Sequence, residues 1–246
     1  MAKEKKTENI KEGIETSKEK EAPIDKKLKK KQNKQIFLAI LMMATVIGIA
    51  IAVPILYNKF YNEFTFINLD FQKTKLGNTM FYSTKIPITN VKPTTGSVIK
   101  QRDITALYGI NFRNDPRYLD VKTNVTSEEL KFVKIGTTYF SFNPDMQNCP
   151  DNGVAMINLA SFLKDFARIN IKSAVSKEEA STTTYPYVTC KNRPQNTVIM
   201  ITSGNETKIE KDSENCYILT YNNCEVTQVT EKFEILLLEG YMRYFE

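Results

Sequence analysis

The feature that most constrains this chain is an uncharged apolar stretch of 22 residues, Ile36 to Tyr57. A helix rises about 1.5 Å per residue, so as a helix the stretch is about 33 Å long, enough to cross a hydrocarbon core of about 30 Å. Phe60 and Tyr61 follow it closely and, with Tyr57, resemble the aromatic belt found at membrane interfaces. The sequence therefore predicts a single transmembrane helix over residues 36–57.

Lysine is distributed unequally on the two sides of this stretch. Residues 1–35 contain 12 Lys and seven acidic residues, a net charge of +5, whereas the rest of the chain has a net charge of only +1. Six of these lysines lie from Lys26 to Lys34, directly before the apolar stretch. The positive-inside rule then places residues 1–35 in the cytoplasm, as a disordered basic tail, and residues 58–246 outside the cell membrane.

Both segments allow a second interpretation. Ala50-Ile51-Ala52 resembles the small-residue site at which signal peptides are cleaved, although the apolar stretch is longer than the usual core of about 7–15 residues. The lysines of residues 26–34 would also suit an arm that binds nucleic acid, but attraction to anionic lipid headgroups already accounts for them. We expect the lipid bilayer as a partner and no nucleic acid.

All four cysteines lie in the region predicted to be outside: Cys149, Cys190, Cys216 and Cys224. An even number in an oxidising compartment indicates two disulfides, with three possible connectivities. Loop closure favours Cys216 with Cys224, which leaves Cys149 with Cys190. A Cys₄ zinc site is the alternative, but the C-x₂₋₄-C pairs typical of such sites are missing. The chain also contains no His, so we expect no metal and no cofactor.

Residues 58–246 carry the patterns of an α/β layered domain with a mixed sheet, clearest over residues 130–246. A strand over 137–143, a helix over 151–168 and a strand over 169–175 predict a βαβ unit with a parallel strand pair. The apolar run 197–202 predicts a central strand that is covered on both faces. We also expect strands at 105–112, 206–210 and 216–221, a helix at 226–242, and a bulged or two-sided strand within 60–75 paired with 81–87.

No nucleotide-binding loop, zinc-protease motif or serine-hydrolase motif is present in the sequence. The best polar cluster is Arg113, Asp115 and Arg117, at a predicted strand end, where ligands gather in α/β sheets. The two arginines could bind a carboxylate or phosphate; alternatively, Asp115 pairs with its Arg neighbours in a turn. Asp145 and Asp151 follow the next predicted strand and could serve acid–base chemistry or a divalent cation, or simply begin a turn and cap a helix.

Several tracts stand out by their composition: Tyr108–Asp120 (YGINFRNDPRYLD), Cys149–Asp151, Thr197–Ile201, Gly204–Thr207 and Asn215–Leu219. In these tracts the chain resembles a group of uncharacterised single-pass archaeal membrane proteins, and the likeness covers most of residues 60–246. The resemblance implies a short cytoplasmic tail, one membrane span and a Cys-containing outer domain. It implies no activity and no site residues.

These observations predict a single-pass membrane protein whose outer domain binds a protein partner, within an envelope or membrane complex. We predict no catalytic residues, chiefly because the absence of His removes every mechanism that needs an imidazole base. The alternative is a membrane-anchored hydrolase that acts on envelope substrates through the carboxylates of Asp115, Asp145 or Asp151.

Overall fold

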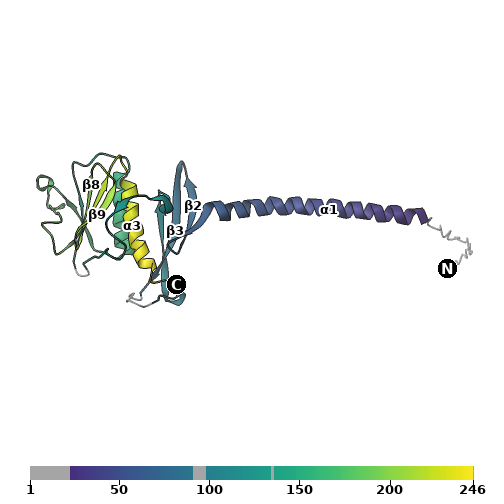
Figure 1. Ribbon diagram of the computed structural model, residues 1–246, viewed down its shortest axis with the longest axis horizontal. Coiled ribbons are helices and arrows are strands. Elements are labelled where there is room, and N and C mark those ends of the chain that lie inside the picture. Colours follow the sequence, from purple (N-terminus) through teal and green to yellow (C-terminus); the bar gives the residue numbers. More distant parts are fainter. Residues whose placement is uncertain (1–22, 91–97, 134–135, 246) are drawn as a thin grey trace, which may run out of the picture. The chain divides into compact units, whose positions relative to one another are not determined.

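The protein is described by a computed structural model that covers residues 23–90, 98–133 and 136–245 (Figure 1). Its contacts divide the chain into two compact units, and the division falls between Leu56 and Tyr57. The described part of the first unit is helical, and the second unit contains every strand of the described chain. The fold is therefore mixed α/β, with one long apolar helix before the sheets, in line with the predicted fold class.

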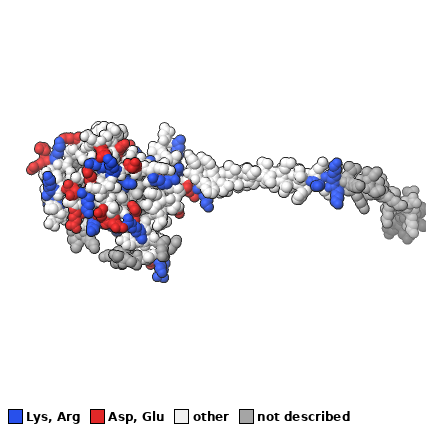
Figure 2. Space-filling model, viewed as in Figure 1, with Lys and Arg blue, Asp and Glu red and all other residues white. Residues whose placement is uncertain are grey.

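Helix α1 (Pro23–Tyr57) makes up the described part of the first unit, and its final residue is the first of the second unit. Every described side chain from Lys29 to Tyr57 is exposed, although most of them are apolar. Figure 2 shows the apolar part of this helix as an unbroken uncharged surface, with basic side chains gathered before it. A water-soluble protein rarely leaves so large an apolar surface uncovered. One helix near the N-terminus is thus long and apolar enough to cross a membrane.

Helix α1 begins before the apolar stretch. Residues 23–35, which we expected to belong to a disordered tail, are helical. Lys and Gln make up most of this segment and both have good helix propensity, and the apolar helix that follows spares it the cost of nucleation. The rest of the expected tail, residues 1–22, lies outside the described residues.

The second unit begins with a π-helical turn, η1 (Asn58–Asn62), and a four-stranded antiparallel sheet. The strands follow one another in space as they do in sequence: β1 (Glu63–Phe66), β2 (Leu69–Leu76), β3 (Thr79–Thr89) and β4 (Ile104–Phe112). The predicted strands at 81–87 and 105–112 are thereby confirmed. Residues 91–97, in the connection from β3 to β4, lie outside the described residues.

The expected bulge in residues 60–75 is instead a hairpin turn. Phe66 pairs with Leu69, and the two residues between them, Ile67 and Asn68, have φ angles of 47° and 59°. Two positive φ angles in a two-residue loop characterise the tight turns whose twist suits antiparallel strands. The change of face in the apolar pattern therefore marks a reversal of the chain. Ile67 is an uncommon occupant, because β-branched side chains disfavour positive φ.

A six-stranded mixed sheet forms the rest of the second unit, in the order β5-β9-β10-β8-β6-β7. Strands β6, β7, β8 and β10 run parallel, whereas β9 is antiparallel to β10. The strands are β5 (Lys122–Thr123), β6 (Thr138–Phe142), β7 (Ile171–Val175), β8 (Thr197–Ser203), β9 (Lys208–Ser213) and β10 (Cys216–Tyr221). The predicted strand at 206–210 thus begins and ends later than expected.

The βαβ unit and the central strand are confirmed. Strand β6, helix α2 (Asn152–Ser161) and strand β7 follow one another, and β6 pairs with β7 in parallel. The helix is shorter than the predicted 151–168, because it continues as a π-helical turn, η4 (Phe162–Phe166), before Arg168 takes a positive φ of 55°. Strand β8 lies between β6 and β10, and the side chains of Val198 and Ile199 are buried on its opposite faces.

Helix α3 (Val226–Met242) has the predicted bounds and packs beside α2. Figure 1 shows it between the mixed sheet on one side and β2 and β3 on the other. One apolar core joins the three layers, with Phe71 from the antiparallel sheet, Phe162 and Phe233 from the helices, and Tyr217 from the mixed sheet. The compact unit is therefore a sheet–helix–sheet sandwich, and the helices form its middle layer.

The two outer faces of the sandwich differ. The long connection between β7 and β8, which includes the short helix η5 (Glu178–Ala180), covers the outer face of the mixed sheet and buries Val188 against Val198 and Ala174. The outer face of the antiparallel sheet carries exposed residues such as Leu107, which is 60% exposed. Two other short helices, η2 (Gln101–Asp103) and η3 (Pro116–Tyr118), precede and follow β4.

Candidate functional site

The predicted cluster lies in the turn that follows β4. The Asp115 carboxylate accepts hydrogen bonds from Arg117 Nε at 2.9 Å and Arg117 Nη2 at 2.6 Å. The Arg117 guanidinium also lies 3.8 Å from the centroid of the Phe64 ring on β1, within cation–π range. Arg113, in contrast, pairs with Asp151 at the start of α2. The two arginines thus engage different carboxylates, and ligand binding by Arg113, Asp115 and Arg117 stays a prediction.

The pKa of the Asp115 carboxyl lies below its ordinary value. Partial burial raises the pKa of its carboxyl, but the hydrogen bonds and positive charge of Arg117 outweigh that effect and lower the pKa overall. Asp115 also accepts a hydrogen bond from the backbone N–H of Arg117 at 3.2 Å, which caps the short helix η3. The pair therefore fixes the turn itself.

Glu231 on α3 holds the same turn, and we did not predict it. Its Oε1 accepts the Arg113 backbone N–H at 2.6 Å, and its Oε2 accepts the Asn114 backbone N–H at 3.0 Å and Asn114 Nδ2 at 2.8 Å. Glu231 is only 6% exposed. Burial raises the pKa of its carboxyl above the ordinary value even though the three hydrogen bonds oppose that shift. A buried carboxylate thus ties the end of β4 to the middle layer.

Glu234, one turn further along α3, is also buried. Among the described residues no side chain or backbone group donates a hydrogen bond to it, and burial, reinforced by the charge of Glu231, raises the pKa of Glu234 well above its ordinary value. Burial also raises the pKa of the Tyr108 hydroxyl on β4, and the charges of Asp165 and Glu234 add to that shift. Burial and the charge of Glu231 therefore both favour the neutral form of Glu234.

The other two predicted carboxylates are each paired with a cation. Asp145 pairs with Lys177 in the connection after β7. Asp151 occupies the residue before α2 but makes no capping hydrogen bond, because its carboxylate pairs with Arg113. Within the described ranges, Asp115, Asp145 and Asp151 do not converge on a shared position of the kind that holds a metal ion. Their roles in acid–base chemistry stay untested predictions.

The two disulfides are Cys149–Cys224 and Cys190–Cys216, with Cα separations of 5.4 and 5.6 Å. Two bonds were predicted, but the favoured pairing of Cys216 with Cys224 was wrong. Cys216 begins strand β10 and Cys224 follows its end. A six-residue strand places its ends about 17 Å apart, whereas bonded cysteines need Cα atoms within about 7 Å. Cys149–Cys224 instead joins the segments that precede α2 and α3.

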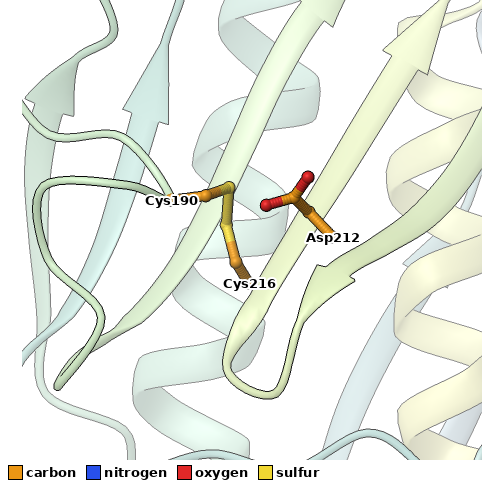
Figure 3. Close-up of side chains that lie close together, drawn as sticks. All are labelled: Cys190, Asp212 and Cys216. Carbon is orange, nitrogen blue, oxygen red and sulfur yellow. A yellow bond between two sulfur atoms is a disulfide. The ribbon is translucent and has the colours of Figure 1, made fainter.

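Figure 3 shows the one group in the described chain whose side chains lie close enough to suggest a metal site: Cys190, Asp212 and Cys216. The two sulfur atoms are bonded to each other, so neither is a thiolate that could bind a metal ion. The Asp212 carboxylate is exposed beside the disulfide. In this oxidised state the group acts as a covalent link between β10 and the β7–β8 connection.

A groove of about 920 Å³ lies along the outer face of the antiparallel sheet. One row of hydrogen-bonding side chains crosses all four strands in register, from Glu63 through Gln72 and Ser83 to Asn111. The remaining polar residues of the groove include Lys59, Thr65, Asp70 and Lys85, and its apolar residues include Pro87, Ile104, Leu107, Met242 and Phe245. The groove combines charges of both signs with an apolar portion, as protein-binding surfaces do.

We did not predict the groove, although the sequence contains a signal for it. At the start of β2 the exposed polar residues Asp70 and Gln72 alternate with Leu69 and Phe71, which are buried in the core. Alternation of this kind predicts a strand with one free face. The same residues do not reveal that the free faces of four strands form one hollow, because hollowness depends on sheet curvature.

No protein-family model, curated protein or solved structure matches this chain. Function is therefore inferred from the geometry described above.

Proposed function

We propose that the protein is a single-pass membrane protein whose disulfide-bonded outer unit binds a protein partner, as part of an envelope or membrane complex. The observation that carries this proposal is the groove on the outer face of the antiparallel sheet. Charged and polar side chains line it together with apolar ones such as Leu107 and Phe245, a mixture that suits contact with a protein partner.

The proposed location rests on two properties of the chain. The lysines of residues 26–34 lie on one side of the apolar segment, which favours that side as cytoplasmic. The two disulfides lie on the other side, and disulfides persist in oxidising compartments outside the cytoplasm. Both properties support the same orientation, with the compact unit outside.

Site-specific photocrosslinking in intact cells tests the partner. A photoreactive residue placed at Asn111 or Gln72 reports on the groove, and one placed at Asn158, an exposed residue of α2, serves as a matched control. We expect a discrete crosslinked protein from the groove positions and none from the control. Crosslinks that are absent from the groove, or equal at both places, would contradict the proposal.

Protease accessibility tests the orientation separately. Protease added to intact cells should cut within residues 58–246 after the disulfides are reduced, whereas residues 1–35 should become accessible only after the membrane is opened. If residues 58–246 stay protected until the membrane is opened, the orientation is wrong, whatever the crosslinking shows.

The hydrolase alternative draws on Asp115, Asp145 and Asp151, each of which is held in an ion pair with Arg or Lys. Replacing any one of these aspartates by Asn would abolish a hydrolase activity but leave partner crosslinking from the groove positions unchanged. No contact among the described residues favours this alternative over the binding protein.

A further inference from the structure

We propose that the end of the β2–β3 hairpin, together with η1, forms a second membrane-contacting surface that binds anionic lipid headgroups. We call this surface the lipid hairpin and define it by Tyr61, Lys73, Lys75, Leu76 and Met80. The inference rests on the proposed membrane anchoring and adds a lipid-binding surface to the compact unit.

The first observation is chemical. The hairpin segment Lys73–Met80 contains two lysines and no acidic residue. Leu76 is 72% exposed and Met80 is 40% exposed, on either side of the turn at Gly77 and Asn78. In Figure 2 the projecting end of this hairpin shows only uncharged and basic atoms. Exposed apolar side chains flanked by lysines characterise surfaces that enter the headgroup layer of an anionic bilayer.

The second observation is the link between this hairpin and the segment that follows the apolar helix. The Tyr57 and Tyr61 rings are stacked with centroids 5.0 Å apart, and the Lys73 ammonium lies 5.0 Å from the centroid of the Tyr61 ring. Phe60, in the same turn η1, is 79% exposed. Tyrosine and phenylalanine at the end of an apolar helix favour the membrane interface. The base of the lipid hairpin is therefore held against aromatic residues of interfacial type.

The third observation is one of length. Leu76 follows Lys73 by three residues in strand β2, which corresponds to about 10 Å along the strand. The headgroup layer on each side of a bilayer is about 5–8 Å thick. A hairpin end that starts at the interfacial tyrosine is thus long enough to reach lipid with Leu76 while Lys73 and Lys75 stay among the phosphates. Apolar residues on both faces of the hairpin suit insertion by its end.

The absence of Trp from the chain makes a direct test possible. In the full chain, reconstituted into vesicles of phosphatidylglycerol and phosphatidylcholine, Leu76→Trp introduces a single fluorophore at the hairpin end. Ile157→Trp on α2, where the native residue is 66% exposed, is the matched control, and Val46→Trp in the apolar helix reports anchoring. Brominated lipids quench only fluorophores that reach the acyl chains.

We expect brominated lipid to remove most of the emission of the Leu76→Trp and Val46→Trp proteins and to leave Ile157→Trp unchanged. Quenching of Val46→Trp without quenching of Leu76→Trp would overturn the lipid hairpin and leave the anchor standing. If Val46→Trp is not quenched, the proposed anchoring fails and the inference fails with it.

A second variant tests the role of charge. Adding Lys73→Gln and Lys75→Gln to the Leu76→Trp protein should reduce its quenching in vesicles that contain phosphatidylglycerol, and so should high salt. In vesicles of phosphatidylcholine alone, the same two substitutions should have little effect. Equal quenching in both lipids, with and without the lysines, would exclude recognition of anionic headgroups. Mass mapping of the two disulfides under non-reducing conditions checks that every variant has folded.

Discussion

The two sheets of the compact unit differ in how they are covered and in how they are cross-linked. The mixed sheet is covered on both faces, and both disulfides involve a residue in or next to its strand β10. The antiparallel sheet is covered on one face, contains no cysteine and bears the groove. We infer that the mixed sheet supplies most of the stability, whereas the exposed residues of the antiparallel sheet can be substituted with little loss of stability. Four predictions test that division.

The largest effect is expected from the disulfide between the helix starts. Replacing Cys149 and Cys224 by Ser frees a loop with a sequence separation of 75 residues, and the chain-entropy relation then lowers the free energy of unfolding by about 4.5 kcal/mol. Removing Cys190 and Cys216, separated by 26 residues, should cost about 3.5 kcal/mol. Denaturant-induced unfolding measures both. A larger loss from the second pair would break the entropy argument.

A core truncation in the mixed sheet should come next. Ile199 is fully buried between the sheet and the helices, so Ile199→Ala should lower the free energy of unfolding by about 2–5 kcal/mol, through lost apolar burial and the cavity left behind. Ile199→Val, which removes a single methylene, is the control and should cost about 0.5–1.5 kcal/mol. Equal small losses for both would mean that the site collapses around the cavity.

Glu234→Gln should stabilise the protein, which is opposite in sign to the first two changes. Because the folded pKa of Glu234 lies above its unfolded value, the folded state binds the extra proton, and stability falls as pH rises from about 4.5 towards that folded pKa. The fall for one such group approaches about 1.4 kcal/mol per pH unit. In the variant, the free energy of unfolding should therefore depend less on pH across this range, which denaturant unfolding at several pH values measures.

Glu231, the other buried carboxyl of α3, should respond differently to the same substitution. The charge of Glu231 raises the pKa of Glu234, and the charge of Glu234 in turn raises the pKa of Tyr108. Glu231→Gln should not give the same benefit, since its carboxylate accepts hydrogen bonds from Arg113 and Asn114 that an amide satisfies less well. An equal gain from both variants would show that charge repulsion outweighs those bonds.

The smallest effects are expected on the open face. Leu107→Ala and Gln72→Ala change exposed residues of the groove, so each should shift the free energy of unfolding by no more than about 0.5 kcal/mol. The same variants should weaken partner crosslinking at Asn111. Losses comparable to that of Ile199→Ala would show that the antiparallel sheet is no more tolerant than the mixed one.

Local patterns predicted the parts of the fold that are governed by periodicity. The apolar helix, the parallel pair β6–β7, the central strand β8 and the bounds of α3 all follow from runs or repeats of apolar residues. The separate antiparallel sheet did not follow from them, because the reversal at Ile67 and Asn68 contains no Gly and resembles a shift of face. Gly, Pro, Asn, Asp and Ser usually mark a turn in a sequence, and this turn has only Asn68 among them.

The candidate sites were harder to predict because they depend on contacts between distant segments. Glu231 and Glu234 fall outside the apolar stripe of α3, so the sequence alone places them in water; they are buried because a second sheet covers that side of the helix. Disulfide pairing failed for the same reason, since strand length and the position of the helix starts decide which cysteines meet. The sequence placed Arg113, Asp115 and Arg117 in one cluster whose ligand binding stays a prediction, and only the structure shows which carboxylate each arginine contacts.

The middle position of α3 has a consequence for how the chain is made. Within the described chain, α3 follows every strand of both sheets. During synthesis the strands are therefore made before α3, and the inner faces of both sheets stay exposed until α3 has left the ribosome. Cys224 is synthesised 75 residues after Cys149, a delay of about 4–15 s at ordinary rates of translation. Over the same interval Cys190 and Cys216 become available as wrong partners. Biogenesis of this protein should therefore depend on a disulfide isomerase and on a chaperone that shields the two sheets until the last helix arrives.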